Sequence, residues 1–304
     1  MLRRIAVTIP LICFTCIAYG QELEPASRWS TVAFSEYVVS SNIVYKKANG
    51  RDIKLDVITA GKPSQVRPTV IFIHGGGWMG ASKENHVLFL LPYLSRGMNA
   101  VNVEYRLGSE SLAPAAVEDC RCALRWVYRH ANDYGFDVSK LVVAGESAGG
   151  HLSLTTGMLS PEAGFDNDCP ADEPPTSSPP KVAAIVNYCG ITDVADLLEG
   201  PNRKPFAVMW FGGVPNRADL ARRLSPLTLV RKGLPPTIIV HGEEDATVPY
   251  QHGVRLHEAL DRAGVPNQLV SIPGGKHWGW PRDQYLRAQQ AVFSFLEQQG
   301  ILTR

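Results

Sequence analysis

A serine in a G-x-S-x-G pattern is the residue of this sequence best suited to covalent catalysis. Residues 141–150 run from an apolar segment through Gly145, Ser147 and Gly149 into small residues. On a sharp strand-to-helix turn such a serine takes a strained backbone conformation, and the two glycines remove Cβ atoms that would collide there. The pattern therefore predicts that Ser147 is a nucleophile held above the edge of a sheet.

An acid is expected in the loop that follows the apolar segment 237–240. A serine hydroxyl is inert without a base, and the base needs a group that orients it. The loop contains Glu243, Glu244 and Asp245 before a Val-Pro pair. We choose Asp245 because it lies at the apex of the loop, and the two glutamates stay as alternatives.

A histidine lies in the next glycine-rich loop, after the apolar segment 268–272. We predict that this residue, His277, takes the proton of Ser147 and returns it to the leaving group, while Asp245 fixes its tautomer. The order serine, acid, histidine is that of elbow-type hydrolases. The other candidate histidines lie at a strand end or in a helical pattern, where structural hydrogen bonds are the more frequent role: His241, His252 and His257.

Three consecutive glycines follow the apolar segment 69–73. The N–H groups of such a run can point at one oxygen without obstruction, so Gly76 and Gly77, with Ala148 after the nucleophile, are predicted to form an oxyanion hole. Phosphate binding is the alternative, but no G-x-G-x-x-G or Walker lysine pattern follows. His74, just before the glycines, is expected to stabilise the loop by hydrogen bonding.

Uniformly apolar segments alternate with helical patterns along most of the sequence. Such segments are expected of strands buried on both faces of a parallel sheet, and an Asn-Gly turn joins two further strands near residue 50. Strands are predicted at residues 42–47, 52–57, 69–73, 100–103, 141–144, 182–186, 237–240 and 268–272. Helices are predicted at residues 84–97, 114–134, 148–159, 251–264 and 283–299. The alternation indicates a doubly wound α/β fold.

Two insertions interrupt this alternation. Residues 160–181 are rich in proline, serine and acidic residues and are expected to form a surface excursion. Residues 195–233 contain Phe206, Trp210 and Phe211 and are a candidate lid. The alternative is an ordinary crossover helix with an aromatic stripe that faces the core.

The first 20 residues have the pattern of a cleaved secretory signal peptide. Two arginines precede an apolar run at residues 5–17 that is too short to span a bilayer comfortably, and an Ala-Tyr-Gly site follows. We therefore expect a secreted or periplasmic protein with one catalytic domain at residues 21–304; a retained membrane anchor is the alternative. Since two of the 30 basic residues lie in the leader, 28 remain against 29 acidic ones, and no charge excess attracts nucleic acid or anionic membranes.

Four cysteines follow the leader. Export makes a disulfide possible, but the sequence does not assign one, and buried free thiols are equally consistent with it. Cys120 and Cys122 lie two apart in a helical pattern and point away from each other, so they are not expected to pair. Their C-x-C spacing does not indicate a metal site, and no metal or cofactor is expected. The four are Cys120, Cys122, Cys169 and Cys189.

Taken together, these segments resemble the α/β-hydrolase superfamily, specifically the HGGG-bearing esterases of the hormone-sensitive-lipase and feruloyl/acetylxylan carbohydrate-esterase branches. The matching pieces are residues 74–78, 105–107, 145–152, Asp245 with the Val-Pro pair, and His277. The resemblance implies an α/β-hydrolase fold, with a mostly parallel sheet, an N-terminal antiparallel hairpin and a small lid. It also implies a cofactor-free serine hydrolase of carboxylic esters. Its triad would be Ser147, Asp245 and His277, and its oxyanion hole Gly76, Gly77 and Ala148.

Two departures from the lipase branch bear on the substrate. That branch usually has Asp before the serine and a sizeable N-terminal cap, whereas this sequence has Glu146 and a short leader. We therefore expect short-chain or aromatic acyl esters, for example the acetyl or feruloyl esters of plant cell-wall carbohydrate. Trp78, Trp210 and Trp278 are candidate substrate contacts, with core packing as the alternative for each.

Three other functions remain open at this point. An arylformamidase-like amide hydrolase would have a similar glycine loop, and a lipase of longer acyl chains would use the same triad. A binding protein on a hydrolase scaffold would typically lack a triad member or the oxyanion glycines, and none is missing here.

Overall fold

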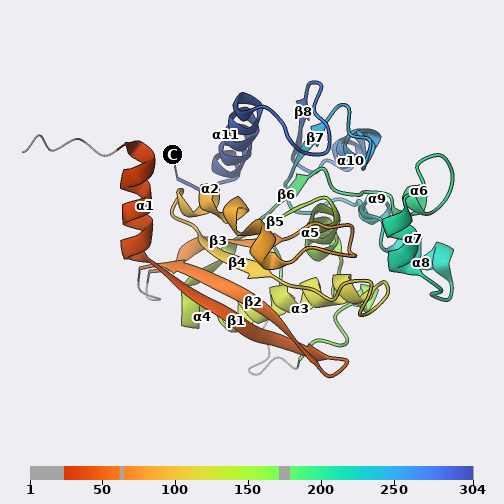
Figure 1. Cartoon of the computed structure of the whole chain (residues 1–304), viewed down its shortest axis with the longest axis horizontal. Helices are drawn as coiled ribbons and strands as arrows, with labels where there is room; N and C mark the ends of the chain where they lie inside the picture. The colour runs from red at the N-terminus through yellow and green to blue at the C-terminus, as the bar shows by residue number, and fades with distance from the viewer. Residues whose placement is uncertain (1–23, 62–64, 171–178, 304) are drawn as a thin grey trace, which may run out of the picture. The chain divides into compact units, whose positions relative to one another are not determined.

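The computed structural model describes residues 24–61, 65–170 and 179–303 (Figure 1). The expected signal peptide, residues 1–20, lies outside these residues. The chain forms two units, residues 1–35 and residues 36–304. The described part of the first is the helix α1 (Pro25–Glu36), which the sequence did not predict and which ends at the first residue of the second unit.

One eight-stranded sheet organises the second unit, in the order β1-β2-β4-β3-β5-β6-β7-β8. β1 and β2 pair antiparallel with each other, β2 pairs antiparallel with β4, and all other neighbours are parallel. The strands are β1 (Tyr37–Ala48), β2 (Arg51–Ala60), β3 (Arg67–Ile73), β4 (Asn99–Val103), β5 (Phe136–Glu146), β6 (Ala184–Tyr188), β7 (Thr237–Gly242) and β8 (Asn267–Ile272). This is the predicted α/β-hydrolase fold, with the mostly parallel sheet and the N-terminal antiparallel hairpin.

The hairpin turns at Asn49 and Gly50, as the sequence predicts. Both residues have positive φ, 52° and 74°, which a two-residue hairpin turn of this type requires and which Asn-Gly tolerates best. The strands extend beyond the predicted ranges, and two register shifts interrupt their pairing.

The central strands are buried on both faces. Every residue of β4, β6 and β7 is buried, which explains why these segments are uniformly apolar rather than alternating. Because the parallel strands point the same way, the loops after β3, β5, β7 and β8 meet at one edge of the sheet.

Helices cover the two faces of this sheet (Figure 1). α2 (Leu91–Leu94) and α11 (Arg282–Gln298) lie side by side on one face, where the rings of Tyr93 and Phe293 are 5.7 Å apart. On the other face lie α3 (Ala115–Arg129), α5 (Ala148–Met158) and α10 (Gln251–Arg262).

The predicted helix at residues 84–97 is wrong as one continuous element. The structure has the 3-10 helix η1 (Lys83–Leu90) followed by the single turn α2. Pro92 explains the division, because proline lacks the N–H that would continue a helix and fits only its first turn. The helix predicted at residues 114–134 is likewise divided at His130, into α3 and α4 (Ala131–Tyr134).

The first insertion is tied to α3. Its described part contains η2 (Pro161–Ala163), and both oxygens of Asp166 accept hydrogen bonds from Arg121 at 2.6 Å. Cys122 forms a disulfide with Cys169, whereas Cys120 and Cys189 are free and buried. Cys120 and Cys122 therefore do not pair with each other, as predicted.

The second insertion, residues 195–233, folds into short helices rather than one crossover helix. These are α6 (Val194–Leu198), α7 (Pro205–Phe211), α8 (Arg217–Arg223) and α9 (Pro226–Leu229). Its role as a lid stays a prediction. Among the described residues, no helix combines the length and apolarity needed to cross a membrane.

Candidate active site

Ser147 lies at the turn between β5 and α5 in the strained conformation that the sequence predicts, with φ 53° and ψ −120°. Glycine is required on both sides of it. A Cβ atom on Gly145 would lie 2.2 Å from the carbonyl oxygen of Gly149, and one on Gly149 would lie 2.0 Å from that of Ile73. The Ser147 N–H donates to Tyr188 O at 2.8 Å, which fixes the turn to the neighbouring strand.

Ser147, His277 and Asp245 come together at the edge of the sheet where β5, β7 and β8 end. His277 Nε2 is 2.9 Å from Ser147 Oγ, and His277 Nδ1 is 2.6 Å from Asp245 Oδ2. A carboxylate only accepts, so Nδ1 carries the imidazole proton and Nε2 is left to accept from the serine hydroxyl. Ser147 and Asp245 are buried, and His277 is half-buried.

Asp245 is held as an anion by four donors. Its Oδ1 accepts from the N–H groups of Thr247 and Val248 at 2.8 and 2.9 Å. Its Oδ2 accepts from His277 and lies 3.3 Å from His241 Nε2. Burial alone would raise the pKa of Asp245, but the hydrogen bonds from His241 and His277 outweigh it and hold this pKa well below its ordinary value.

His241 is a site residue that the sequence reasoning placed only in a structural role. Its fully buried imidazole has Nε2 2.9 Å from Val248 O. A carbonyl can only accept, so Nε2 carries the proton and also points at the Asp245 carboxylate. The available signal was a histidine at the end of β7, four residues before the acid.

The glycine loop after β3 lines the same cavity as Ser147. Gly76 and Gly77 have φ of 106° and 61°, and a Cβ atom on Gly76 would lie 2.2 Å from Gly80 O. Among the described residues, neither the Gly76 nor the Gly77 N–H has a protein acceptor. Ala148, the third predicted donor, is the first residue of α5. These groups are therefore available to a ligand oxygen.

The opposite side of that loop is fixed by Tyr105 and His74. The Tyr105 hydroxyl donates to the carbonyl oxygens of His74 and Gly75 at 3.0 and 3.1 Å, and His74 Nδ1 is 2.8 Å from Gly75 O. Burial lowers the pKa of His74 to about 4, so this imidazole is neutral at pH 7. His74 thus makes the loop-stabilising contact expected of it.

A cavity of about 280 Å³ opens onto Ser147 and His277. Its other walls are formed by Gly76, Gly77, Glu146, Phe206, Thr247 and Trp278. A larger cavity of about 360 Å³ lies near the starts of β6 and β7 and contains none of the three candidate catalytic residues.

Of the three tryptophans predicted to contact substrate, only Trp278 lines the site cavity. Trp78 and Trp210 are fully buried and stack on each other with ring centroids 4.2 Å apart. The expectation that these two contact substrate is therefore corrected, because no surface of either ring is accessible. Their role is packing, and the sequence did not indicate that Phe206 and Thr247 reach the cavity instead.

Glu146 forms part of the cavity wall and pairs with His86. Its Oε1 is 2.8 Å from His86 Nε2, and a Cβ atom on Gly75 would lie 2.0 Å from the same oxygen. Burial lowers the pKa of His86, but the Glu146 carboxylate outweighs that effect and leaves the pKa above its ordinary value. Gly75 thus leaves room for the carboxylate of Glu146. An aspartate at position 146 would be too short to place its carboxylate there.

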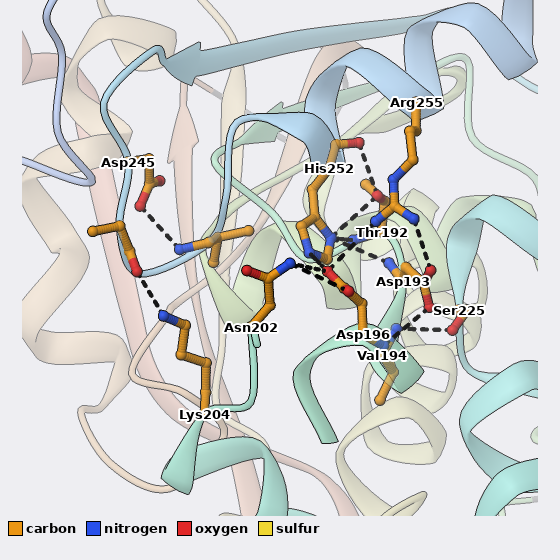
Figure 2. Close-up of polar contacts among 12 residues, drawn as sticks. Thr192, Asp193, Val194, Asp196, Asn202, Lys204, Ser225, Asp245, His252 and Arg255 are labelled. Atoms are coloured by element: carbon orange, nitrogen blue, oxygen red, sulfur yellow. Dashed lines mark hydrogen bonds and ion pairs between the residues drawn. The ribbon is translucent and has the colours of Figure 1, made fainter. Parts of the chain in front are cut away.

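The second insertion is anchored near Asp245 (Figure 2). Lys204 Nζ donates to Ala246 O at 2.7 Å, in the loop that carries Asp245. A separate group of contacts surrounds His252, whose Nδ1 accepts from Thr192 N at 3.1 Å and whose Nε2 is 3.1 Å from Asp196 Oδ2. His252 therefore has the structural role expected of it, and His257 contacts Asn267 outside the cavity.

Only one group of side chains in the described part of the chain has the spacing of a metal site: Cys189, His241 and Asp245. Burial raises the pKa of the Cys189 thiol well above its ordinary value, so the thiolate that binds metal is disfavoured. The other two residues already bond to each other, and the chemistry of the donor set does not favour a metal.

The sequence pattern of the BD-FAE family matches residues 55–260. The chain is 27% identical to esterase LipC of Mycobacterium tuberculosis over 71% of its own length, and it spans only 54% of that relative. Among solved structures, it is 29% identical to apo Thermogutta terrifontis esterase 2, with a TM-score of 0.74, covering 88% of this chain and 96% of that one.

A second solved structure is a truncated carbohydrate esterase from gut microbiota. It is 25% identical with a TM-score of 0.69, and the match covers 86% of this chain and 96% of that one. The matched family segment runs from within β2 to within α10 and includes Ser147, Asp245 and the glycine loop. The chain therefore belongs to the BD-FAE family and, with it, to the esterases of the α/β-hydrolase fold.

Proposed function

We propose that this chain is a serine carboxylesterase of short-chain or aromatic acyl esters, with Ser147, His277 and Asp245 as its catalytic triad. The observation that carries the proposal is the continuous hydrogen-bonded path from Ser147 Oγ through His277 to Asp245, beside a cavity of about 280 Å³. The esterase names of the relatives support the same class of reaction.

The first half of the reaction transfers the acyl group to the enzyme. Ser147 Oγ attacks the ester carbonyl carbon while His277 Nε2 takes its proton, and the carbonyl oxygen becomes an oxyanion. The N–H groups of Gly76, Gly77 and Ala148 bind that oxyanion. When the tetrahedral intermediate collapses, the bond to the alcohol oxygen breaks and His277 gives its proton to the departing alcohol.

Water completes the second half at the same groups. His277 Nε2 takes a proton from the water, whose oxygen attacks the acyl carbon, and the collapse returns the proton to Ser147 Oγ and releases a carboxylic acid. Asp245, held as an anion by its donors, stabilises the imidazolium in both halves.

A small acyl group and a carbohydrate alcohol fit these observations. A cavity of about 280 Å³ lies at the small end of the range for ligand sites. Thermogutta terrifontis esterase 2 has been solved with propionate and with butyrate, and another structural relative is a carbohydrate esterase. We infer that acetyl groups on plant cell-wall carbohydrate are suitable substrates. Feruloyl groups, which are about as long as an octanoyl chain, are the second candidate, and turnover of methyl ferulate tests them.

We infer that the protein is exported to the periplasm or the medium. The Cys122–Cys169 disulfide belongs in an oxidising environment, and residues 1–20 have the composition of a secretory signal. Expression of the full sequence in a host with a secretion pathway should yield a chain that begins at Gln21, which mass spectrometry of the medium or periplasm would test.

An ester panel tests the substrate proposal. We expect wild-type protein to hydrolyse p-nitrophenyl acetate with higher kcat/KM than p-nitrophenyl octanoate, and to release acetate from acetylated xylan. Preference for the octanoate would contradict the short-acyl assignment. Faster turnover of an aryl formamide than of every ester would identify an amide hydrolase instead.

A further inference from the structure

We propose that Phe206 sets the upper limit on the length of the acyl chain that this site accepts. The inference deepens the proposed function and rests on it. Phe206 comes from α7, in the second insertion, and lines the cavity beside Ser147.

The Phe206 ring packs directly against the glycine loop. A Cβ atom on Gly77 would lie 3.0 Å from both Cβ and Cγ of Phe206, so this side chain and the loop backbone are already in contact. Gly77 leaves just enough room for the ring. The wall that Phe206 forms is therefore immediately next to the amides proposed to bind the ester carbonyl oxygen.

The chemistry of the reaction decides which part of an ester meets this wall. The carbonyl oxygen lies at the Gly76 and Gly77 amides, and the alcohol oxygen must lie within reach of His277 Nε2, which protonates it. The remaining substituent of the carbonyl carbon is the acyl chain. In the proposed arrangement it extends away from His277, toward the part of the cavity wall that Phe206 forms against the glycine loop.

The wall is backed by a close-packed aromatic group. The rings of Phe206 and Trp78 are 6.0 Å apart, and Trp78 stacks on Trp210 at 4.2 Å. Trp78 Nε1 donates to His151 Nδ1 at 3.2 Å, and His151 Nε2 in turn is 2.8 Å from Leu224 O. Because both tryptophans are fully buried and close-packed, Phe206 cannot move further toward them.

The start of α7 is fixed as well. Lys204, two residues before Phe206, donates to Ala246 O in the loop of Asp245 (Figure 2). The backbone just before Phe206 is thus tied to the loop of Asp245, while the Phe206 side chain packs on the glycine loop. A longer acyl chain would have to displace the Phe206 side chain, although the hydrogen bond of Lys204 fixes the backbone before it and the buried Trp78 ring packs behind it.

Trp278 provides a matched comparison on a different wall. It follows the proposed base in sequence, and its ring lies 5.8 Å from that of His277 and 5.9 Å from that of Trp280. It therefore faces the alcohol part of an ester, and its removal should alter preference for the alcohol rather than for the acyl chain.

The test compares p-nitrophenyl acetate, butyrate and octanoate with wild type, Phe206→Ala, Trp278→Ala and Met209→Ala. Met209 is 52% exposed on the same helix and serves as the control for changes in α7. We expect the octanoate-to-acetate ratio of kcat/KM to rise about tenfold or more in Phe206→Ala, since a few methylenes in an apolar pocket are worth that much. The ratio should change less than about twofold in the other two variants.

An unchanged ratio in Phe206→Ala, or an equal rise in Trp278→Ala, would overturn the inference. If Phe206→Ala does not fold, Phe206→Leu shortens the wall while keeping an apolar side chain, and the same ratio should rise by a smaller factor. An unchanged ratio in a folded Phe206→Leu would then count against it.

Serine-directed phosphonates separate this inference from the proposed function. Wild type should react faster with a p-nitrophenyl ethylphosphonate than with the octyl analogue, and Phe206→Ala should narrow that difference. If folded wild type reacts with neither, the proposed function fails. If it reacts with both and substitution of Phe206 does not alter their relative rates, only the acyl-length inference fails.

Discussion

Asp245 Oδ2 lies 2.6 Å from His277 Nδ1, which fixes the tautomer of the imidazole and leaves its Nε2 lone pair directed at the serine hydroxyl. In the proposed mechanism, Asp245 therefore acts on Ser147 only through His277. Its own position depends on two backbone amides and on His241, so the loop after β7 is built around this one carboxylate.

Asp245→Asn should keep the fold and lower kcat by about 10⁴-fold, because an amide nitrogen facing Nδ1 favours the wrong tautomer of His277. The measurement is steady-state turnover of p-nitrophenyl acetate, with circular dichroism to check folding. Glu243→Gln and Glu244→Gln are matched controls, since both side chains are exposed in the same loop. A larger loss in either control than in Asp245→Asn would move the acid to that residue.

Tyr105→Phe should lower kcat by about tenfold with little change in KM. The lost hydroxyl donates to two carbonyl oxygens of the glycine loop. Without it the loop is held less firmly, so binding of the oxyanion in the transition state weakens more than binding of the ground-state ester. Tyr128→Phe removes a hydroxyl that also donates to a backbone carbonyl, that of Lys181, outside the cavity. Equal effects of the two substitutions would show that loss of stability, rather than loop position, reduces the activity.

Stability should fall as the pH drops from 6.5 to 4. Burial lowers the pKa of His151 from 6.5 to about 4. In that interval the unfolded chain binds a proton on this imidazole and the folded chain does not, so the free energy of unfolding decreases by up to about 3 kcal/mol from this residue alone. His74 has the same shift from burial and adds to the effect.

Urea unfolding at several pH values measures this dependence. His151→Gln should be less stable overall, because contacts to Trp78 and Leu224 change, but its stability should depend less steeply on pH between 6.5 and 4. A slope equal to that of wild type would mean that His151 does not carry the proton linkage.

The sheet and the three residues of the proposed triad follow from local signals in the sequence. Each of Ser147, Asp245 and His277 comes just after an apolar strand, and parallel strands bring such loops to one edge of a sheet. The need for glycine at positions 145 and 149 is also a local signal, since the turn itself excludes a Cβ atom at both positions. The position of Pro92 was also sufficient to divide the helix predicted at residues 84–97, although the helical pattern concealed it.

Local sequence signals did not predict contacts between residues that lie far apart in the sequence. Trp78 and Trp210 have the same residue type as Trp278, and only the docking of α7 on the glycine loop buries the first two and leaves Phe206 in the cavity. His241 likewise gains its contact with Asp245 from the path of the loop between them. These features depend on tertiary packing, which residue type and spacing do not specify.

The central claim is that Ser147 is the nucleophile, and the kcat/KM of Ser147→Ala on p-nitrophenyl acetate tests it most directly. Ser153→Ala is the matched control, because Ser153 is a buried serine of α5, the helix that follows Ser147, and its hydroxyl donates to Gly150 O. We expect Ser147→Ala to lose at least about 10³-fold in kcat/KM while remaining folded, and Ser153→Ala to stay close to wild type. A folded Ser147→Ala protein with activity within about tenfold of wild type would contradict the claim.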